Sequence, residues 1–454
     1  MKNTRETAFG IIYKVLEDGE YSHVVLRQAL AKEIDAEKRD RAFVTRLSEG
    51  TIEHLLTIDY ILNQLSKTPV KKMKPVIRTV LRMSVYQLLY MDSVPDSAVC
   101  NEAVKLVKAK GLQGLSGFVN GILRNVARGK EQWLQESFYP DKDKMPAMHL
   151  SIRYSMPEWL CSYFIKEYGF EKAEKIVEGS LRNPKTTIRC NTNKISVDDL
   201  ADRLYRQGID VEKGVYAKDA LYLSGYDALE KIPEFMEGLF QVQDESSMLV
   251  AELAGLKKDD LVLDVCSAPG GKALHAANIL ESFGGGNVIS RDVSEKKTAL
   301  IKENISRLQV KNVTVQVADA TQNDDTMIEK ADVVIADLPC SGIGIMAKKP
   351  EIRYRMTKEN QNELVKLQKK MLAVVHRYVK PGGILMYSTC TINKEENEEQ
   401  VREICEKYGF VPAMEESLVP ESLKENVENG AFLQLFPGLH ACDGFFIARL
   451  RKEK

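Results

Sequence analysis

Apolar residues recur at helical spacing through the first 130 residues. The i, i+3, i+4, i+7 pattern is present over 8–15 and returns over 118–126. A turn and a helix start are indicated at Pro95, and Gly111 is placed to end that helix. The pattern predicts an all-helical domain over residues 1–130.

Residues 131–150 lose this periodicity and contain two prolines, so we expect a linker there. Helical and strand-like patterns of ordinary length follow it. They span 158–168, 171–181, 186–191 and 197–207. The sequence therefore predicts a small α+β subdomain over 151–238.

From Leu261 onward, short apolar strands alternate with longer amphipathic helices. The predicted strands are 261–265, 287–291, 313–317, 333–336, 384–387 and 445–450. This alternation is typical of an α/β domain with a mostly parallel sheet and helices on both faces. Ligands of such sheets bind beyond the carboxyl ends of the strands, so the residues that follow each strand are the candidates for chemistry.

The composition excludes several classes of protein. With 454 residues, 44% hydrophobic and 28% charged, the chain is typical of a globular protein of two or three domains. No stretch approaches the roughly 18 uninterrupted apolar residues that a membrane span needs, and the N-terminus has no signal-peptide pattern, so we expect a cytoplasmic protein. The eight cysteines lie far apart without metal-ligand spacing, which argues against a metal site or a disulfide framework.

The net charge of −1 conceals an asymmetry along the chain. Residues 1–130 contain 21 Lys and Arg against 14 Asp and Glu, and the rest of the chain is correspondingly acidic. Arg124 and Arg128 stand four residues apart on the last helix predicted in this domain and are followed by Lys130. This cationic stripe is either a solubilising surface or a phosphate-contacting face, and the asymmetry favours a polyanionic partner.

The first strand of the α/β region leads into a glycine-rich turn, after which a helix is expected to open at Ala273. Glycines let the backbone approach a ligand closely, and a helix N-terminus offers free N–H groups to an anion. The spacing is neither that of the dinucleotide fingerprint G-x-G-x-x-G nor that of a P-loop. The turn consists of Cys266, Ser267, Ala268, Pro269, Gly270, Gly271 and Lys272.

Aspartates follow the first four predicted strands, at Asp264, Asp292, Asp319 and Asp337. Any one of them is explained equally well as a helix cap. Four in succession indicate a row of acceptors along one cofactor. Asp292 stands where α/β nucleotide-binding folds place an acid for the ribose hydroxyls.

Two cysteines also follow strands directly. Cys340 lies in D-L-P-C-S-G after the fourth strand, and Cys390 lies in S-T-C-T after the fifth. A buried thiol is the ordinary role of a cysteine, but the neighbouring acids favour chemistry here. A thiolate near a helix N-terminus or a lysine has a lowered pKa and is a competent nucleophile.

Together these motifs resemble the RNA cytosine-C5 methyltransferases of the RsmB/NOP type, which use S-adenosylmethionine. The resemblance covers residues 150–450 and departs from the usual pattern at Ser267, where Ala is usual, and at Arg291, where an apolar residue is common. The matching motifs are C-S-A-P-G-G-K at 266–272, D-L-P-C-S-G at 337–342, S-T-C-T at 388–391, V-Q-D-E at 242–245 and D-G-F-F at 443–446. In the helical region, N-E-A-V-K at 101–105 and F-V-N-G-I-L-R-N at 118–125 resemble the NusB-type RNA-binding domain.

The resemblance implies a Rossmann-like S-adenosylmethionine methyltransferase domain over 239–454. An all-helical RNA-binding domain and a small α+β RNA-binding subdomain precede it in the sequence. It implies that Cys390 is the nucleophile and that Cys340 assists product release. The residues that it places along the cofactor are 266–272, Asp292, Asp319 and Asp337. On chemical grounds, we expect Asp337 to hold N3 or the amino edge of the base and Lys272 to favour charged intermediates. The implied partner is 16S ribosomal RNA. The enzyme is expected to be a monomer and to need no metal ion.

Three other functions fit parts of the sequence. An amine methyltransferase of the same fold grips its substrate with an aromatic residue after a Pro-Pro pair, where this chain has Cys340. A non-catalytic RNA-binding factor would not need both cysteines. An NAD-dependent dehydrogenase is disfavoured by the missing G-x-G-x-x-G.

Overall fold

The computed structural model describes residues 4–32, 36–182 and 184–454. They divide into two compact units. The helical unit comprises the described residues up to Arg182 together with Met346–Arg355, and the sheet unit comprises 184–345 together with Met356–Lys454. A short segment from the second half of the sequence is therefore part of the helical unit.

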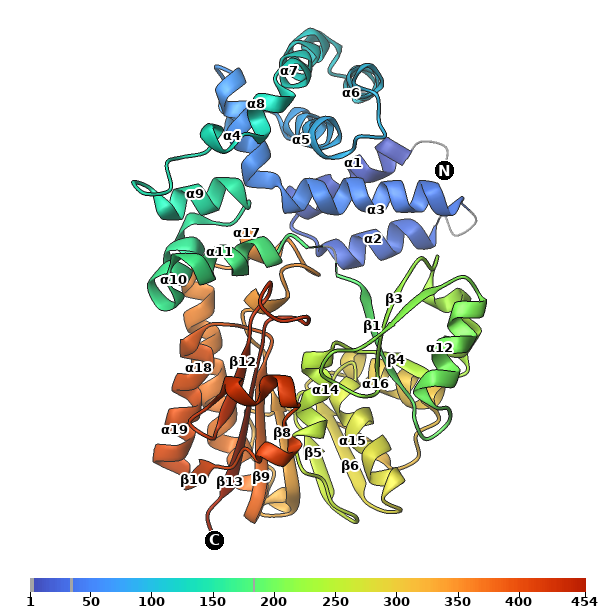
Figure 1. The fold of residues 1–454 in the computed structure, drawn as a ribbon, viewed down its shortest axis with the longest axis vertical. Helices are drawn as coiled ribbons and strands as arrows, with labels where there is room; N and C mark the ends of the chain where they lie inside the picture. Colours follow the sequence, from blue (N-terminus) through green and yellow to red (C-terminus); the bar gives the residue numbers. More distant parts are fainter. Residues whose placement is uncertain (1–3, 33–35, 183) are drawn as a thin grey trace. The chain divides into compact units, whose positions relative to one another are not determined.

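The described part of the helical unit is built from helices, which confirms the all-helical prediction (Figure 1). Helix α6 begins directly after Pro95, and Gly111 follows it with a φ of +74°, as the turn signals predicted. Apolar faces of α1, α3, α5 and α7 bury one continuous core. The helices are α1 (Thr4–Leu16), α2 (Ser22–Ala31), α3 (Lys38–Glu53), α4 (Leu55–Leu65), α5 (Pro75–Tyr90), α6 (Asp96–Ala109), α7 (Ser116–Arg128), α8 (Lys130–Leu134), α9 (Pro146–Arg153), α10 (Glu158–Tyr168), α11 (Phe170–Gly179) and α17 (Ile352–Arg355).

The structure differs from the expected organisation in the stretch 131–150. Most of α8, a 3-10 turn over Glu136–Phe138 and the start of α9 lie there, and Trp133 is buried against the helical core. These helices are too short to show a periodicity, because each covers only one or two turns. The helical unit continues through α10 and α11, which we expected in the α+β subdomain.

Residues 346–355 are bound into the helical unit through a buried arginine. The Arg353 side chain is fully buried and donates hydrogen bonds to four carbonyl oxygens. These belong to Ser180 at 2.9 Å, Met346 at 3.3 Å, and Glu53 and Ser155 at 3.5 Å each. Three carbonyls from distant positions and one from the same segment thus share the terminal nitrogens of one guanidinium, while its Nε has no partner among the described residues. Such a group is costly to bury unless its donors are paired.

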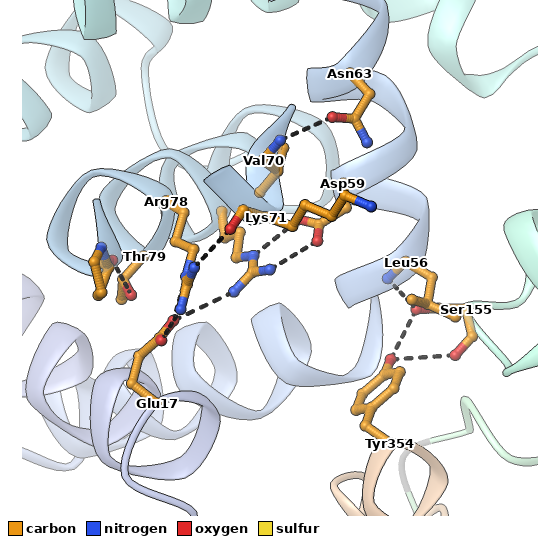
Figure 2. A network of polar contacts seen from close by, with 12 residues as sticks. Glu17, Leu56, Asp59, Asn63, Val70, Lys71, Arg78, Thr79, Ser155 and Tyr354 are labelled. Carbon is orange, nitrogen blue, oxygen red and sulfur yellow. Dashed lines mark hydrogen bonds and ion pairs between the residues drawn. The ribbon is translucent and has the colours of Figure 1, made fainter. Parts of the chain in front are cut away.

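The neighbours of Arg353 add further contacts to the same segment. The Tyr354 hydroxyl lies 2.8 Å from the Ser155 hydroxyl, which accepts the Leu56 N–H at 2.8 Å (Figure 2). Glu351 is buried and accepts both the hydroxyl and the N–H of Ser22, at 2.6 and 3.1 Å. The segment is therefore an integral part of the helical unit.

The first part of the sheet unit contains a four-stranded antiparallel sheet in the order β2-β3-β1-β4. Helix α12 (Val197–Arg206) is capped by Ser196, whose hydroxyl accepts the Asp199 N–H, and the helix packs with the sheet around a small apolar core. The strands are β1 (Thr186–Cys190), β2 (Asp210–Lys213), β3 (Ala220–Ser224) and β4 (Phe240–Val242), and α13 (Pro233–Met236) precedes β4.

A mixed sheet of nine strands forms the rest of the sheet unit as described, in the order β11-β12-β13-β9-β8-β5-β6-β7 with β10 beside β13. The run from β9 to β7 is parallel, and β10 to β13 are antiparallel additions. The strands are β5 (Leu261–Asp264), β6 (Asn287–Asp292), β7 (Val313–Val317), β8 (Ala331–Asp337), β9 (Val379–Thr389), β10 (Phe410–Pro412), β11 (Val427–Glu428), β12 (Phe432–Leu435) and β13 (Phe445–Lys452). All six predicted strands are present, and the mostly parallel α/β fold is confirmed.

Helices cover both faces of this sheet (Figure 1). Helices α14, α15 and α16 lie on one face, and α18 and α19 lie on the other. They are α14 (Glu245–Glu252), α15 (Gly271–Ser282), α16 (Glu295–Leu308), α18 (Lys358–Val375) and α19 (Glu398–Tyr408). The central strands are buried on both faces, which explains their nearly continuous apolar sequences.

Candidate active site

The strand order places the predicted aspartates in a row along the carboxyl edge of the sheet. Asp337, Asp264 and Asp292 end the adjacent strands β8, β5 and β6, and Asp319 follows β7 two residues beyond its end. Cys390 follows β9, next to β8. Because neighbouring strands are about 4.8 Å apart, these residues line one continuous edge.

The glycine-rich turn connects β5 to α15 at the centre of this edge. Gly270 has a φ of +102°, which favours glycine, and α15 begins at Gly271, two residues before the predicted start. Beneath the turn, Asp264 is buried and its Oδ2 has no hydrogen-bond partner among the described residues. Burial, opposed by Lys272, raises the pKa of Asp264 to about 7. A free helix N-terminus and an unpaired buried carboxylate oxygen fit the carboxylate and ammonium groups of an amino-acid moiety.

Asp292 is buried and already organises the glycine turn. Its Oδ2 accepts the Ala268 N–H at 2.9 Å, and its Oδ1 accepts the Val293 N–H at 2.8 Å and lies 3.1 Å from Lys297 Nζ. Carboxylate oxygens accept more than one hydrogen bond each, so capacity for ribose hydroxyls remains.

Replacing Asp292 by alanine is expected to weaken S-adenosylmethionine binding about 10- to 100-fold. The loss of a charged acceptor of buried hydroxyls costs on the order of 1.5–3 kcal/mol. Titration calorimetry measures the affinity, and the melting temperature of the variant checks that the turn is intact. An Asp292→Ala variant that folds and binds the cofactor as tightly as the unmodified protein would remove Asp292 from the ribose site.

Asp319 lines a cavity of about 210 Å³ at the ends of β5 to β7. The Thr321 N–H and hydroxyl hold one of its carboxylate oxygens at 2.8 Å each and lower the pKa of Asp319. Arg291 lines the same cavity and pairs with Asp324 at 2.6 Å, which explains an arginine where an apolar residue is common. The cavity suits the adenosine end of a cofactor bound across the row of aspartates.

Lys272 and Asp337 form an ion pair of 2.7 Å between α15 and β8. Burial lowers the pKa of Lys272, but Asp337, Asp264 and the charge of Cys390 raise it by more, so its pKa is raised overall. Asp337 Oδ1 accepts the Ser388 hydroxyl at 2.8 Å. The lysine is thus held as a cation close to Cys390.

Cys340 and Cys390 meet at this edge with their sulfur atoms 3.2 Å apart. The hydrogen bond to Cys390 and burial, followed by the charges of Glu396 and Asp337, raise the pKa of Cys340 well above its usual value. The raised pKa favours the protonated form of Cys340, and either thiol can donate the hydrogen bond between them. Burial and the surrounding carboxylates also raise the pKa of Cys266, which makes that thiol an unsuitable nucleophile.

The sequence reasoning missed two groups at this site. Ser388 was noted only as part of a motif, and Glu396 was not noted at all, although it is fully buried behind both cysteine loops. An acidic residue six positions after Cys390 carries no local signal, because its partners lie in other segments. Within 4–32, 36–182 and 184–454, no cluster of His, Cys, Asp and Glu is arranged to hold a metal ion, and no helix is long and apolar enough to cross a membrane.

Comparisons with known proteins agree with this arrangement. The family model for 16S rRNA methyltransferase RsmB/F matches residues 251–451, the NusB family matches 2–128, and the ferredoxin-like domain of RsmF/B-like methyltransferases matches 156–228. A protein of Bacillus subtilis (strain 168) is 36% identical over 458 residues, with 100% of both chains covered. Ribosomal RNA small subunit methyltransferase B of Proteus mirabilis (strain HI4320) is 30% identical over 452 residues, with 99% of both covered.

Among solved structures, that of NSun6 from Pyrococcus horikoshii with SFG matches with a TM-score of 0.56 and 25% identity, over 66% of this chain and 98% of that one. The fold and the site define a methyltransferase whose cofactor is S-adenosylmethionine. The chain belongs to the ribosomal RNA small subunit methyltransferase B family, with a NusB-like domain at its N-terminus.

Proposed function

We propose that the protein transfers a methyl group from S-adenosylmethionine to carbon 5 of one cytosine in 16S ribosomal RNA, through a covalent adduct between Cys390 and carbon 6. The observation that carries this proposal is the contact between the Cys340 and Cys390 sulfurs beside the Lys272–Asp337 pair. Family membership supports the class of substrate.

The residues at the site suit this chemistry. Carbon 5 of cytosine is a weak nucleophile, so the Cys390 thiolate adds to carbon 6 first and turns the ring into an enamine. The Lys272 cation stabilises the thiolate, and Asp337 is placed to hold N3 or the amino group of the base. The base must leave its stack to enter such a site.

Cys340 serves the second half of the reaction. After carbon 5 has accepted the methyl group, a general base must take its proton. The electron pair of that C–H bond restores the double bond between carbons 5 and 6, and Cys390 leaves carbon 6 as a thiolate. Cys340 Sγ lies 3.2 Å from the sulfur that has to depart, so its thiol can return a proton to Cys390. This geometry supports a role in release.

The proposed cofactor site follows the edge of the sheet. Residues 266–272 and Asp264 would hold the methionine moiety, Asp292 the ribose, and Asp319 with its cavity the adenine. S-adenosylmethionine supplies an electrophilic methyl group when bound. The chain's own contribution is to orient it toward the cysteines at the neighbouring strand end.

Release of tritium from carbon 5 tests the proposal directly. RNA made with 5-tritiated cytosine should lose tritium to water only when protein and S-adenosylmethionine are both present. Bisulfite mapping of ribosomal RNA from cells that lack the protein should then show one cytosine that is no longer protected. Methyl transfer without tritium release would contradict carbon 5 as the acceptor.

We infer that the basic helical domain contributes affinity for RNA and takes no part in methyl transfer. We also infer that the enzyme is a monomer and acts in the cytoplasm. Arg124 and Arg128 lie exposed on α7, as the stripe in the sequence predicts. Deleting residues 1–130 is a poor test, because residues 346–355 would lose the helical unit that holds them.

The double variant Arg124→Gln/Arg128→Gln is expected to bind RNA with a weaker salt dependence. The slope of log affinity against log salt should fall by about 0.7–0.9 for each phosphate that the variant no longer neutralises. Filter binding at several salt concentrations measures this slope, with Lys67→Gln/Lys71→Gln, two exposed lysines of the same unit, as the matched control. Equal slopes for the Arg124/Arg128 variant and the unmodified protein would assign this stripe to solvation alone.

A further inference from the structure

A buried carboxylate lies behind the two cysteine loops. Glu396, fully buried in the short turn Lys394–Glu396, accepts hydrogen bonds on both of its carboxylate oxygens. Oε1 accepts the Ser341 hydroxyl at 2.6 Å and the Asn393 amide at 3.1 Å. Oε2 accepts the Ser341 N–H at 2.8 Å and the Gln368 amide at 3.1 Å.

These partners belong to the segments that carry the cysteines. Ser341 follows Cys340 directly, and its hydroxyl also lies 2.7 Å from the hydroxyl of Thr391, which follows Cys390 directly. Gln368 extends the same network to the other side of Cys340, because its amide also donates to the Pro339 carbonyl at 2.9 Å. The loop after β8 is therefore tied to this carboxylate directly beside Cys340, and the loop after β9 is tied to it through Asn393 and, by way of Ser341, through Thr391.

We propose that Glu396 is a positioning residue that sets the separation of the Cys340 and Cys390 sulfurs by holding the loop after β8 and the loop after β9 together. This inference rests on the proposed roles of the two cysteines. Glu396 lies behind the loops and touches neither sulfur in the hydrogen bonds of the described chain.

The choice of a carboxylate has a physical reason. Four donors converge on two oxygens, and a carboxylate is acceptor-only on both, so each donor is satisfied. A glutamine of the same size would turn an N–H₂ group toward donors and leave at least one of them unpaired in a buried site. The negative charge of Glu396 also contributes to the raised pKa of Cys340 and so helps to keep that thiol protonated.

Single-turnover methylation by Glu396→Gln, with saturating cofactor and RNA, tests the proposal. We expect the rate to fall about 10- to 100-fold, since a displacement of about 1 Å at reacting groups costs as much. Affinities for RNA and cofactor should stay within about threefold of the unmodified protein. Ser341→Ala keeps the backbone bond to Glu396 and is a milder variant for the case that Glu396→Gln does not fold; it should show a smaller fall in the same rate.

Alkylation of Cys340 gives a readout that a merely structural role would not move. In a Cys390→Ala background, Glu396→Gln should shift the midpoint of Cys340 alkylation by iodoacetamide to lower pH, because one of the charges that raise this pKa is removed while Asp337 remains. Mass spectrometry identifies the alkylated cysteine.

Glu245→Gln is the matched control. Glu245 is another fully buried glutamate of the sheet unit, and one of its oxygens accepts the N–H groups of Tyr216 and Ala217 at 2.7 and 2.9 Å. Its single-turnover rate should stay within about threefold of the unmodified protein, although its stability falls. A normal rate in Glu396→Gln, or an equal fall in Glu245→Gln, would overturn the positioning role. If the unmodified protein forms no adduct with 5-fluorocytosine RNA, the proposed function fails instead.

Discussion

Cys390→Ala should lose methyl transfer by a factor of about 10³ or more, and it should form no covalent complex with RNA. Cys340→Ala should instead accumulate a protein–RNA complex that survives denaturing gel electrophoresis. The nucleophile is needed to form the adduct, whereas a release residue is needed only to dissolve it. The two sulfurs lie only 3.2 Å apart, so their position does not distinguish the nucleophile from the release residue, and the phenotypes must separate the roles.

The opposite assignment has a chemical precedent within the sequence itself. Pro339-Cys340 matches the Pro-Cys from which DNA cytosine methyltransferases take their nucleophile. Adducts in Cys390→Ala and none in Cys340→Ala would transfer the nucleophilic role to Cys340. RNA that carries 5-fluorocytosine is the positive control for the unmodified protein. Carbon 5 of this base carries fluorine in place of the proton that must be lost, so the covalent adduct cannot be resolved. No adduct in any of the three proteins would remove the covalent mechanism.

Arg353→Met should destabilise the helical unit by about 2–4 kcal/mol, since each buried carbonyl left unpaired costs about 1–3 kcal/mol. The substitution removes the donor that the carbonyls of Ser180 and Met346 share, whereas those of Glu53 and Ser155 keep the Tyr354 hydroxyl. It also removes a positive charge that opposes the burial of Glu53, whose pKa burial already raises. Urea unfolding followed by circular dichroism measures the loss.

Arg124→Met supplies the comparison, because Arg124 is an exposed arginine of the same unit. Its free energy of unfolding should change by no more than about 0.5 kcal/mol. If Arg353→Met unfolds at the same urea concentration as the unmodified protein, the four carbonyls do not depend on this guanidinium, and residues 346–355 are only loosely attached.

Much of the candidate active site at the carboxyl edge of the sheet is predictable from the sequence, because the patterns that mark it are local. The strand Val313–Val317 alternates valines with polar residues, and the aspartates and cysteines lie at strand ends or within three residues after them. The position of each strand end in a parallel sheet then brings these residues to one edge. The family motifs add the roles that spacing alone leaves open.

The parts that sequence reasoning missed depend on contacts between distant segments. Glu351 to Arg355 contain three charged residues and look like an exposed turn, yet Arg353 is fully buried because carbonyls far away in the chain meet it. Glu396 is hidden in the same way, since its main partner Ser341 lies in another loop. The short antiparallel strands β10 and β11 carry too few residues to show an alternation.

The inclusion of residues 346–355 in the helical unit has a consequence for how such proteins arise. A gene fusion that adds an N-terminal RNA-binding domain to a methyltransferase supplies the helices but not the buried arginine that they require. The catalytic gene must acquire a matching segment soon after its D-L-P-C-S-G motif. Relatives without the helices do not need an arginine at the position of Arg353. We therefore expect an arginine there in methyltransferases that carry the helical domain and other residues in those that lack it.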